Sequence, residues 1–388
     1  MTQVWTKSEN KILATLQDVV AIDSVNPSLP GGAQGESGMV QYLTNFFEGL
    51  DIPCEMHEVL PGRSNFIATF EGENTQKVLL FECHMDTASA EVMTIPPFEP
   101  HIRDGFLYGR GSCDTKAGGV AMIHAMKQLK EAGIKPAHTI KYAGAVDEEH
   151  FFNGSRHLAA NLKVDAAVIA EPTDLEVIRA HKGAVRFHLV VQGKAAHSSK
   201  PYLGINAITK MARLIVRIEE ELGPVYAGKS HPLLGSPTFS IGVIEGGMQV
   251  NFVPDQCRIA VDCRSIPGDT TEGIIADFKG VIERAQAEDG ELDAVVEEAY
   301  FVCAPLGTEE DAELVRVVSE ACEAVLGEAK VDGVPYATDG SPFSEIGVPA
   351  VVLGPGSIDQ AHGAVEWVEC EQVIKAVDIY RRIMESGV

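Results

Sequence analysis

The stretch "VLLFECHMDTAS", residues 78–89, places a base and an acid directly after a run of apolar residues. Residues i and i+2 of a strand lie on the same side of a sheet. We therefore expect His84 and Asp86 to point together beyond the end of a buried strand. A histidine with a carboxylate on its other ring nitrogen can serve in metal binding or acid–base chemistry. A single His-x-Asp pair is also common on ordinary surfaces, so the rest of the chain decides between these interpretations.

The composition indicates a soluble globular protein with more than one domain. The chain has 388 residues, is 45% hydrophobic and 22% charged, and its eight cysteines form no Cys-x-x-Cys pair. No apolar run approaches the roughly 20 residues needed to cross a bilayer, and residues 1–20 resemble an amphipathic helix rather than a signal peptide. A net charge of −25 argues against nucleic acid or an anionic membrane as a partner. We expect a cytoplasmic protein with a small-molecule substrate.

The apolar runs predict the fold class. Short apolar runs at 78–81, 140–146 and 166–170, and another near residue 350, alternate with helical patterns. One helical pattern, at 117–133, has apolar residues at three-to-four spacing and closes with a glycine. Alternating strands and helices predict an α/β domain with a mostly parallel sheet.

The middle of the chain has a different order of elements. A strand after Lys182 is followed by a helix at 206–223, two strands around 237–247 and 255–268, a helix at 271–288 and a strand at 293–301. This β-α-β-β-α-β order is ferredoxin-like and predicts an inserted α+β domain. The predicted limits are 1–180 and 296–388 for the two parts of the α/β domain, and 181–295 for the insertion.

Polar residues follow each predicted strand of the α/β domain. The ligand site of an open α/β sheet lies beyond the carboxyl ends of its strands, so we expect these side chains to converge. They are His84, Asp86, Asp147, Glu148, Glu149 and Glu171, with Asp114 in the glycine-rich turn before a helix and His362 near the C-terminus. Each residue taken alone has an ordinary structural explanation, such as a helix cap or a strand end. Together they favour a functional site.

The predicted site has the ligands of a two-metal centre. Two histidines and at least five carboxylates cannot all stay ionised side by side unless cations lie among them. Imidazole and carboxylate together suit Zn²⁺, Mn²⁺ or Co²⁺. A hydroxide that bridges two divalent ions is a strong nucleophile at neutral pH. Of the adjacent Glu148 and Glu149, one would then be a ligand and the other a general base.

The order of the motifs resembles a known family. It is similar to the di-zinc amidohydrolases and exopeptidases that include acetylornithine deacetylase, succinyl-diaminopimelate desuccinylase, aminoacylase and glutamate carboxypeptidase. The resemblance covers nearly the whole chain, through "HMDTAS", "GRGSCDTKAG", "DEEH", "AEPTD", "GKAAHSSKPYLGINAI", "GGMQVNFVPDQC", "DCRS", "TDGSPF" and "GPGSIDQAHGAVEWV". It implies a catalytic domain with an inserted lid and dimerisation domain, and a homodimer formed through the lids.

The resemblance also implies roles for individual residues. His84, Asp114 and Glu171 would hold one metal ion, and Asp114, Glu149 and His362 the other. The metal would be Zn²⁺, with Co²⁺ or Mn²⁺ as alternatives. Further roles follow in the same way: Asp86 would orient His84, Glu148 would be the general base, and the peptide between Asp114 and Thr115 would be cis.

Substrate contacts are implied as well. His197 would help to polarise the scissile carbonyl in the active site of the partner subunit, Asn251 would contact the substrate, and Arg264 would bind its carboxylate. The pocket would also be lined by Thr338, Gly340 and Gly356.

The expected reaction is hydrolysis of the N-acyl amide of an amino acid. The phrases "VIRAHKG" and "LGPGSIDQAH" favour N-acetylornithine, whereas "ATDGSPF" leans toward the desuccinylase pattern. Succinyl-diaminopimelate or a di- or tripeptide therefore stays open as the substrate. Two other classes are an inactive metal-binding scaffold, which would not need Glu148 and His197, and a dinucleotide-binding enzyme. The turn "GRGSCDTKAGG" lacks the G-x-G-x-x-G spacing of the latter.

Overall fold

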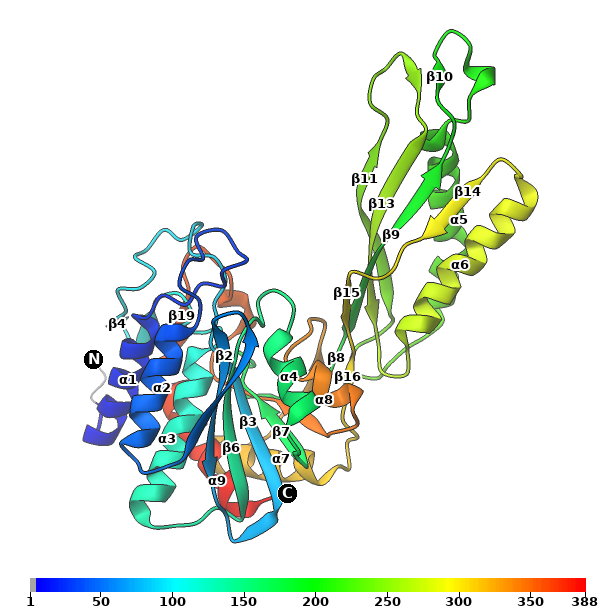
Figure 1. Ribbon diagram of the computed structural model, residues 1–388. Coiled ribbons are helices and arrows are strands. Elements are labelled where there is room, and N and C mark those ends of the chain that lie inside the picture. Colours follow the sequence, from blue (N-terminus) through cyan, green and yellow to red (C-terminus); the bar gives the residue numbers. More distant parts are fainter. Residues whose placement is uncertain (1–4) are drawn as a thin grey trace. The chain divides into compact units, whose positions relative to one another are not determined.

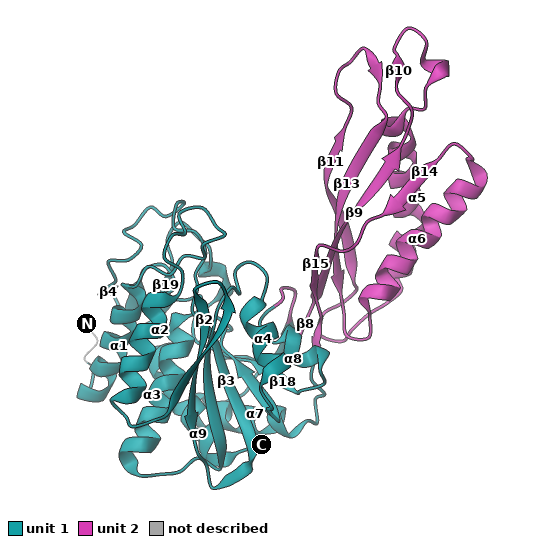
Figure 2. Cartoon of the chain, viewed as in Figure 1, with its two compact units in different colours: residues 1–179, 307–333, 338–388 teal, residues 180–306, 334–337 magenta. Residues whose placement is uncertain are grey.

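The computed structural model describes residues 5–388 and divides the chain into two compact units (Figures 1 and 2). Unit 1 comprises Met1–Arg179, Gly307–Gly333 and Thr338–Val388. Unit 2 comprises Ala180–Leu306 and Val334–Ala337, so it interrupts unit 1 in the sequence. Among residues 5–388, no helix is long and apolar enough to span a membrane.

Unit 1 is built on a mixed sheet whose central strands are parallel. The strand order is β1-β2-β6-β3-β7-β18-β8-β16, with β17 paired to β8. The four neighbours β6, β3, β7 and β18 run parallel, and β1 and β2 add an antiparallel edge. The bounds are β1 Cys54–Leu60, β2 Arg63–Phe70, β3 Asn74–His84, β6 His138–Ala145, β7 Ala166–Ile169, β8 Val177–His181, β16 Leu306–Gly307, β17 Val331–Val334 and β18 Ala350–Val352. The predicted α/β class is confirmed.

The central strands are apolar because helices cover the sheet. All four residues of β7 are buried, and so are Leu79, Leu80 and Phe81 of β3. Continuous apolar runs are typical of parallel strands that are buried on both faces. The helices of unit 1 are α1 Lys7–Val20, α2 Ser37–Glu48, α3 Lys116–Ala132, α4 Asn153–Asn161, α7 Glu313–Leu326, α8 Ser341–Glu345 and α9 Cys370–Ser386, with a 3₁₀ turn η2 at Ile358–Gln360.

Helix α3 follows from its sequence pattern. Val120, Ile123 and Met126 recur at three-to-four spacing and are buried. The helix ends at Gly133, whose φ of 68° lies in the left-handed region that glycine adopts at low cost. Beside the site, a small sheet of order β19-β5-β4 links Trp367–Glu369, Phe106–Tyr108 and His101–Arg103.

Unit 2 has a five-stranded antiparallel sheet of order β11-β13-β9-β14, in which β15 also pairs with β9, and helices α5 and α6 pack against it (Figure 2). Burial alternates along β13, as expected for a sheet with one face on helices and the other exposed. The pairing of β15 with β9 extends the unit to Leu306. The bounds are β9 Gly183–Gln192, β10 Ala196–His197, η1 Pro201–Leu203, α5 Ala207–Ala227, β11 Thr238–Gly246, β12 Phe252–Val253, β13 Gln256–Ser265, α6 Thr271–Glu288, β14 Asp293–Val296 and β15 Phe301–Cys303.

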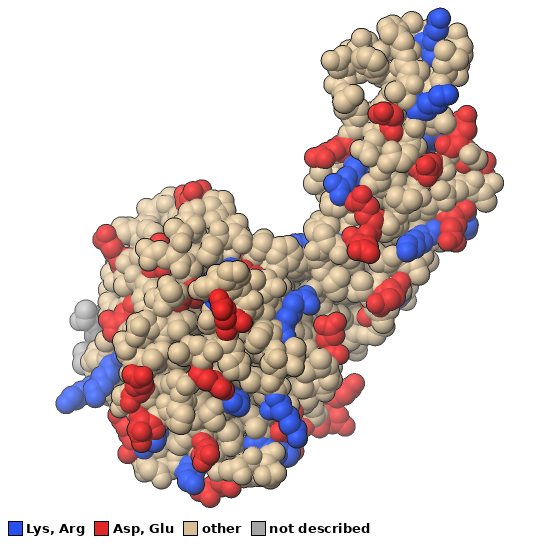
Figure 3. All heavy atoms as spheres, viewed as in Figure 1, with Lys and Arg blue, Asp and Glu red and all other residues tan. Residues whose placement is uncertain are grey.

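The charged surface agrees with the acidic composition. On the visible face in Figure 3, acidic side chains are spread over both units with Lys and Arg side chains among them. On this face the negative charge is not gathered in a single patch.

Candidate active site

The polar residues that follow the parallel strands of unit 1 meet at one end of the sheet. His84 is the last residue of β3, Glu149 follows β6, and Glu171 lies two residues beyond β7. Asp114 comes two residues before α3, and His362 follows the turn η2. The rule that parallel strands share one carboxyl edge therefore accounts for most of the site.

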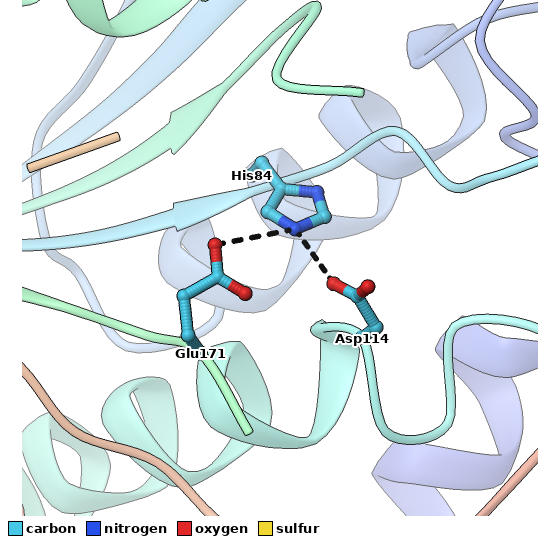
Figure 4. A group of neighbouring side chains, drawn as sticks. All are labelled: His84, Asp114 and Glu171. Atoms are coloured by element: carbon cyan, nitrogen blue, oxygen red, sulfur yellow. Dashed lines mark hydrogen bonds and ion pairs between the residues drawn. The ribbon is translucent and has the colours of Figure 1, made fainter. Parts of the chain in front are cut away.

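The first ligand group contains His84, Asp114 and Glu171. Nε2 of His84 lies 3.1 Å from Asp114 Oδ1 and 4.0 Å from Glu171 Oε1 (Figure 4). Their ligand atoms all lie within 4.8 Å of one another, and all three residues are buried. One nitrogen and two carboxylate oxygens at this spacing could bind a divalent cation.

The second ligand group contains Asp114 again, with Glu149 and His362. Nε2 of His362 lies 3.2 Å from Asp114 Oδ2 and 3.0 Å from Glu149 Oε2. Asp114 thus turns one oxygen toward His84 and the other toward His362. A carboxylate with this arrangement is suited to bridging two ions. The Asp114–Thr115 peptide is cis, as predicted.

The electrostatics of the cluster fit divalent cations. Burial raises the pKa of Glu171 well above its usual range, and it also raises the pKa of Glu149. The neighbouring carboxylates Asp114 and Glu149 raise the pKa of His362 to about 11. Among the described residues, no hydrogen-bond donor reaches the buried Oε1 of Glu149. Several buried carboxylates with too few donors are what a pair of cations would compensate.

Glu148 lies beside the ligand groups. Burial raises its pKa well above the ordinary carboxyl value. The charge of His84 opposes this increase, whereas the charges of Glu171 and Asp339 add to it. A carboxyl group with a raised pKa can both accept and return a proton near neutral pH.

Asp86 supports His84 through its main chain. Nδ1 of His84 lies 2.9 Å from the Asp86 carbonyl oxygen and 3.7 Å from Asp86 Oδ1. The sequence predicted that the His84 ring would contact the carboxylate of Asp86. The carboxylate instead accepts hydrogen bonds from Asn26 Nδ2 and from the main-chain N–H groups of Glu148 and Glu149, at 2.7, 3.2 and 3.1 Å. The Asp86 carbonyl therefore favours the His84 tautomer that has Nε2 free to bind a metal.

Asn26 links Asp86 to a buried ion-pair network that the sequence did not predict. Asn26 also donates to Asp147, whose φ of 68° turns the chain into the Glu148–Glu149 pair. Nη1 of Arg63 lies 3.0 Å from Asp147 Oδ1, and its Nε lies 2.9 Å from a carboxylate oxygen of Glu36. These partners are far apart in the sequence, and no local motif marks Asn26, Glu36 or Arg63.

Two further buried acids were missed. Burial raises the pKa of Glu82 well above its usual range, and the charge of Asp339 adds to the increase. The pKa of Asp339 is raised to about 6, mainly by burial, while its hydrogen bond from Ser155 opposes the increase. Glu82 lies within residues 78–89, but nothing in the local sequence indicates that a second acid, Asp339, lies beside it.

The predicted pocket residues of unit 1 have structural contacts of their own. The hydroxyl of Thr338 is buried and accepts the N–H of Gly340 at 3.1 Å. Gly356 has a φ of 91°, and a Cβ there would lie 2.5 Å from the sulfur of Cys113. A side chain at this position would therefore collide with the segment that carries Asp114.

The other predicted substrate residues belong to unit 2. His197 ends β10, is exposed, and contacts Ser199 Oγ through Nδ1 at 2.8 Å. Across the β10–β12 pair His197 lies opposite Phe252, and the next residue, Ser198, donates its N–H to the carbonyl of Asn251 at 3.0 Å. Arg264 lies on β13, where its Nε donates to Asp262 at 2.8 Å.

Comparison with known proteins agrees with this geometry. The sequence pattern of peptidase family M20/M25/M40 matches residues 80–386. The acetylornithine deacetylase of Vibrio campbellii (strain ATCC BAA-1116) is 30% identical over 382 residues, which cover 96% of this chain and 97% of that protein. A probable succinyl-diaminopimelate desuccinylase of Staphylococcus aureus (strain MRSA252) is 28% identical, with 97% of each chain covered.

The fold is also shared with solved structures. The aminopeptidase PepT of Bacillus cereus ATCC 10987 superposes with a TM-score of 0.81 at 23% identity, covering 97% of this chain and 98% of that one. At this identity the similarity supports the fold alone. The family pattern covers most of the chain, and its residues include both ligand groups. The chain belongs to peptidase family M20/M25/M40 and is a metal-dependent hydrolase of amide bonds.

Proposed function

We propose that this enzyme removes the acyl group from an N-acyl amino acid, and that its substrate is N-acetylornithine. The observation that carries the reaction is the shared carboxylate: Asp114 joins two ligand groups next to the carboxyl group of Glu148. The choice of N-acetylornithine as the substrate is based on the 30% identity to an acetylornithine deacetylase. The motifs "VIRAHKG" and "LGPGSIDQAH" also support it.

The chemistry requires two divalent ions, which we take to be Zn²⁺, with Co²⁺ or Mn²⁺ as alternatives. Bound by the two groups, they would polarise the scissile carbonyl and lower the pKa of a water molecule. His84, Asp114 and Glu171 would hold one ion, and Asp114, Glu149 and His362 the other. The donor set of imidazole nitrogens and carboxylate oxygens suits these metals and needs no thiolate.

The protein supplies the proton transfers. Glu148 takes a proton from the attacking water and returns it to the leaving amine nitrogen. Asp86 fixes the position of Glu148, because its carboxylate accepts the Glu148 N–H. The raised pKa of the Glu148 carboxyl favours the proton-accepting half of this cycle.

Unit 2 would supply the remaining contacts. His197 would donate a hydrogen bond to the developing oxyanion in the partner subunit, Asn251 would contact the substrate, and Arg264 would bind its carboxylate. For Thr338, Gly340 and Gly356 we propose the weaker role of shaping the pocket wall. In this proposal, residues 181–295 form the lid of a homodimer. The exposed strand β11 at the edge of the unit 2 sheet offers an unpaired surface for such an assembly.

Succinyl-diaminopimelate is the main alternative substrate. The identity of 28% to a probable desuccinylase over 97% of this chain is close to that of the deacetylase. The stretch "ATDGSPF" also leans toward the desuccinylase pattern.

Amine release by protein reconstituted with Zn²⁺ would test the proposal. N-acetylornithine, N-succinyl-diaminopimelate and a tripeptide would be compared, with Glu148→Ala as the control. We expect fast, chelator-sensitive cleavage of N-acetylornithine that the variant lacks. Preferential cleavage of another substrate would overturn the substrate assignment and leave the reaction class. A protein that binds two ions but hydrolyses none of the three would favour the inactive-scaffold alternative.

A further inference from the structure

We propose that Glu366 is a positioning residue that clamps the bridging Asp114 to the segment carrying His362. In this role it sets the metal affinity of the second ligand group. The inference rests on the proposed function only in that the two ligand groups bind divalent ions.

Glu366 is fully buried, and its carboxylate is surrounded by N–H donors from the turn that carries Asp114. Its Oε1 accepts the main-chain N–H groups of Cys113 and Asp114 at 2.9 and 3.0 Å. Its Oε2 accepts the N–H of Gly111 at 3.1 Å and Nη1 of Arg110 at 2.6 Å. Three main-chain donors of one turn therefore surround a carboxylate that comes from the C-terminal part of the chain.

Arg110 extends the clamp to two other segments. The guanidinium is buried, and its Nη2 donates to the Ser89 carbonyl at 2.7 Å and to the Gly363 carbonyl at 3.4 Å. Ser89 follows the strand end that bears His84, and Gly363 directly follows His362. The Arg110–Glu366 pair thus touches the segments that carry three of the ligands.

The charges and donors explain why this pair must stay intact. A buried N–H group without an acceptor is destabilising, so the three donors of the turn depend on the Glu366 carboxylate. Without the carboxylate, these N–H groups would lose their acceptor and the turn would rearrange. The Asp114 side chain would then move with its main chain. Arg110 would also be left as an unpaired buried charge.

Removal of the Glu366 carboxylate would weaken metal binding unequally in the two ligand groups. In the first group, His84 is held by strand β3 and by the Asp86 carbonyl. The Glu171 side of this group is tied to the Asp114 turn by Thr115 Oγ1, which donates to Ala170 at 3.1 Å. In the second group, the side chain of His362 is 60% exposed and lies on a loop only four residues from Glu366. The other member, Glu149, is held by the Asp86 carboxylate, so His362 is the member of the second group that has the fewest supports besides the clamp.

Calorimetric titration of the metal-free full-length protein with Co²⁺ tests the clamp without any substrate. Glu366→Gln keeps the shape of the side chain and removes its charge. Ile383→Ala, which deletes buried side-chain volume in α9, is the matched control for general destabilisation. We expect Glu366→Gln to bind its first equivalent within about threefold of the wild type and its second at least about tenfold more weakly. Ile383→Ala should bind both equivalents normally.

Three results would overturn the inference. They are unchanged affinity for both equivalents in Glu366→Gln, equal weakening of both, or the same selective loss in Ile383→Ala. If circular dichroism shows that Glu366→Gln does not fold, Glu366→Asp replaces it, because it keeps the charge but is too short to span all the donors. Failure of both variants to fold would assign Glu366 to folding and also overturn the inference. Because the readout is metal binding, a wild type that binds two Co²⁺ ions without hydrolysing amides would refute only the proposed function.

Discussion

The carboxylate of Asp86 accepts the main-chain N–H of Glu148, with 3.2 Å between Asp86 Oδ1 and the nitrogen. Its other oxygen accepts the N–H of Glu149 at 3.1 Å, and its main-chain carbonyl contacts Nδ1 of His84 at 2.9 Å. A single buried residue therefore fixes the proposed base, one ligand of the second group and one ligand of the first. This relationship makes Asp86 a positioning residue for both halves of the site.

Replacing Asp86 with Asn tests this relationship. The amide has one acceptor oxygen where the carboxylate has two, so one of the two N–H groups in the turn loses its partner. We expect kcat for the best amide substrate to fall about 10- to 100-fold in the Zn²⁺-loaded protein, a loss typical of residues that support metal ligands. Steady-state kinetics would measure it, with Asp18→Asn on the exposed side of α1 as the control. Equal rates in both variants would contradict the prediction.

The adjacent Glu148 and Glu149 should respond differently to the same substitution. Glu148→Gln removes a proton acceptor, so we expect kcat to fall by about 10²- to 10⁴-fold while two metal ions stay bound. Glu149→Gln removes a ligand of the second group, so it should lower the metal content as well. Metal analysis of both proteins after equilibrium dialysis, together with kinetics, separates the roles. Loss of metal from Glu148→Gln alone would exchange the two assignments.

Asp114 and Glu171 should differ in how many ions they control. Asp114 faces both histidines, at 3.1 and 3.2 Å, whereas Glu171 belongs to the first group alone. We expect Asp114→Asn to weaken both binding steps and Glu171→Gln to weaken one. Co²⁺ titration monitored by visible absorption would count the steps. Retention of both steps in Asp114→Asn would show that this carboxylate does not bridge.

Metal affinity should rise with pH. Neighbouring carboxylates raise the pKa of His362 to about 11, and the net shift of the His84 pKa is also well upward. In the metal-free protein at pH 7 both imidazole rings are therefore cationic, and a metal ion must displace one proton from each ring. Affinity should decrease from pH 8 to pH 6, with roughly one proton released per histidine at neutral pH. Calorimetry in buffers of different ionisation enthalpy measures this number, and binding without proton release would contradict the pKa directions.

Lys116 should make the stability of unit 1 depend on pH. Its Nζ is buried and donates to the carbonyls of Val19 and Ile22 at 2.9 and 2.7 Å, and burial lowers its pKa to about 7. Between this value and the ordinary 10.5, the folded state binds fewer protons than the unfolded chain. The free energy of unfolding should therefore rise with pH across this window, relative to Lys116→Met, by up to about 1.4 kcal/mol per pH unit.

Urea unfolding of both proteins at pH 7, 8 and 9 would measure this difference. Because the two proteins share all other titrating groups, their difference isolates Lys116. A difference that does not change with pH would show that Lys116 stays charged in the folded protein.

The sequence alone determined the α/β class and which polar side chains meet at one edge of the sheet. Apolar runs mark β3, β6, β7 and β18, and parallel strands present their carboxyl ends on one edge of the sheet. Residues directly after those runs must therefore meet, whatever the details of packing. His84, Glu149 and Glu171 are therefore expected to lie together from the sequence alone. The motif order then indicated the family.

The tertiary structure alone decided how these ligands are held. Arg110 and Glu366 are 256 residues apart in sequence, and Arg63 and Glu36 belong to different elements that no local pattern connects. Asp86 contacts His84 through its carbonyl because its carboxylate is already occupied by the turn of Glu148. Local sequence fixes which side a residue faces, since strands and helices have fixed periods. The choice of a hydrogen-bond partner depends on which distant segments packing brings within about 3 Å, and only the folded chain determines that.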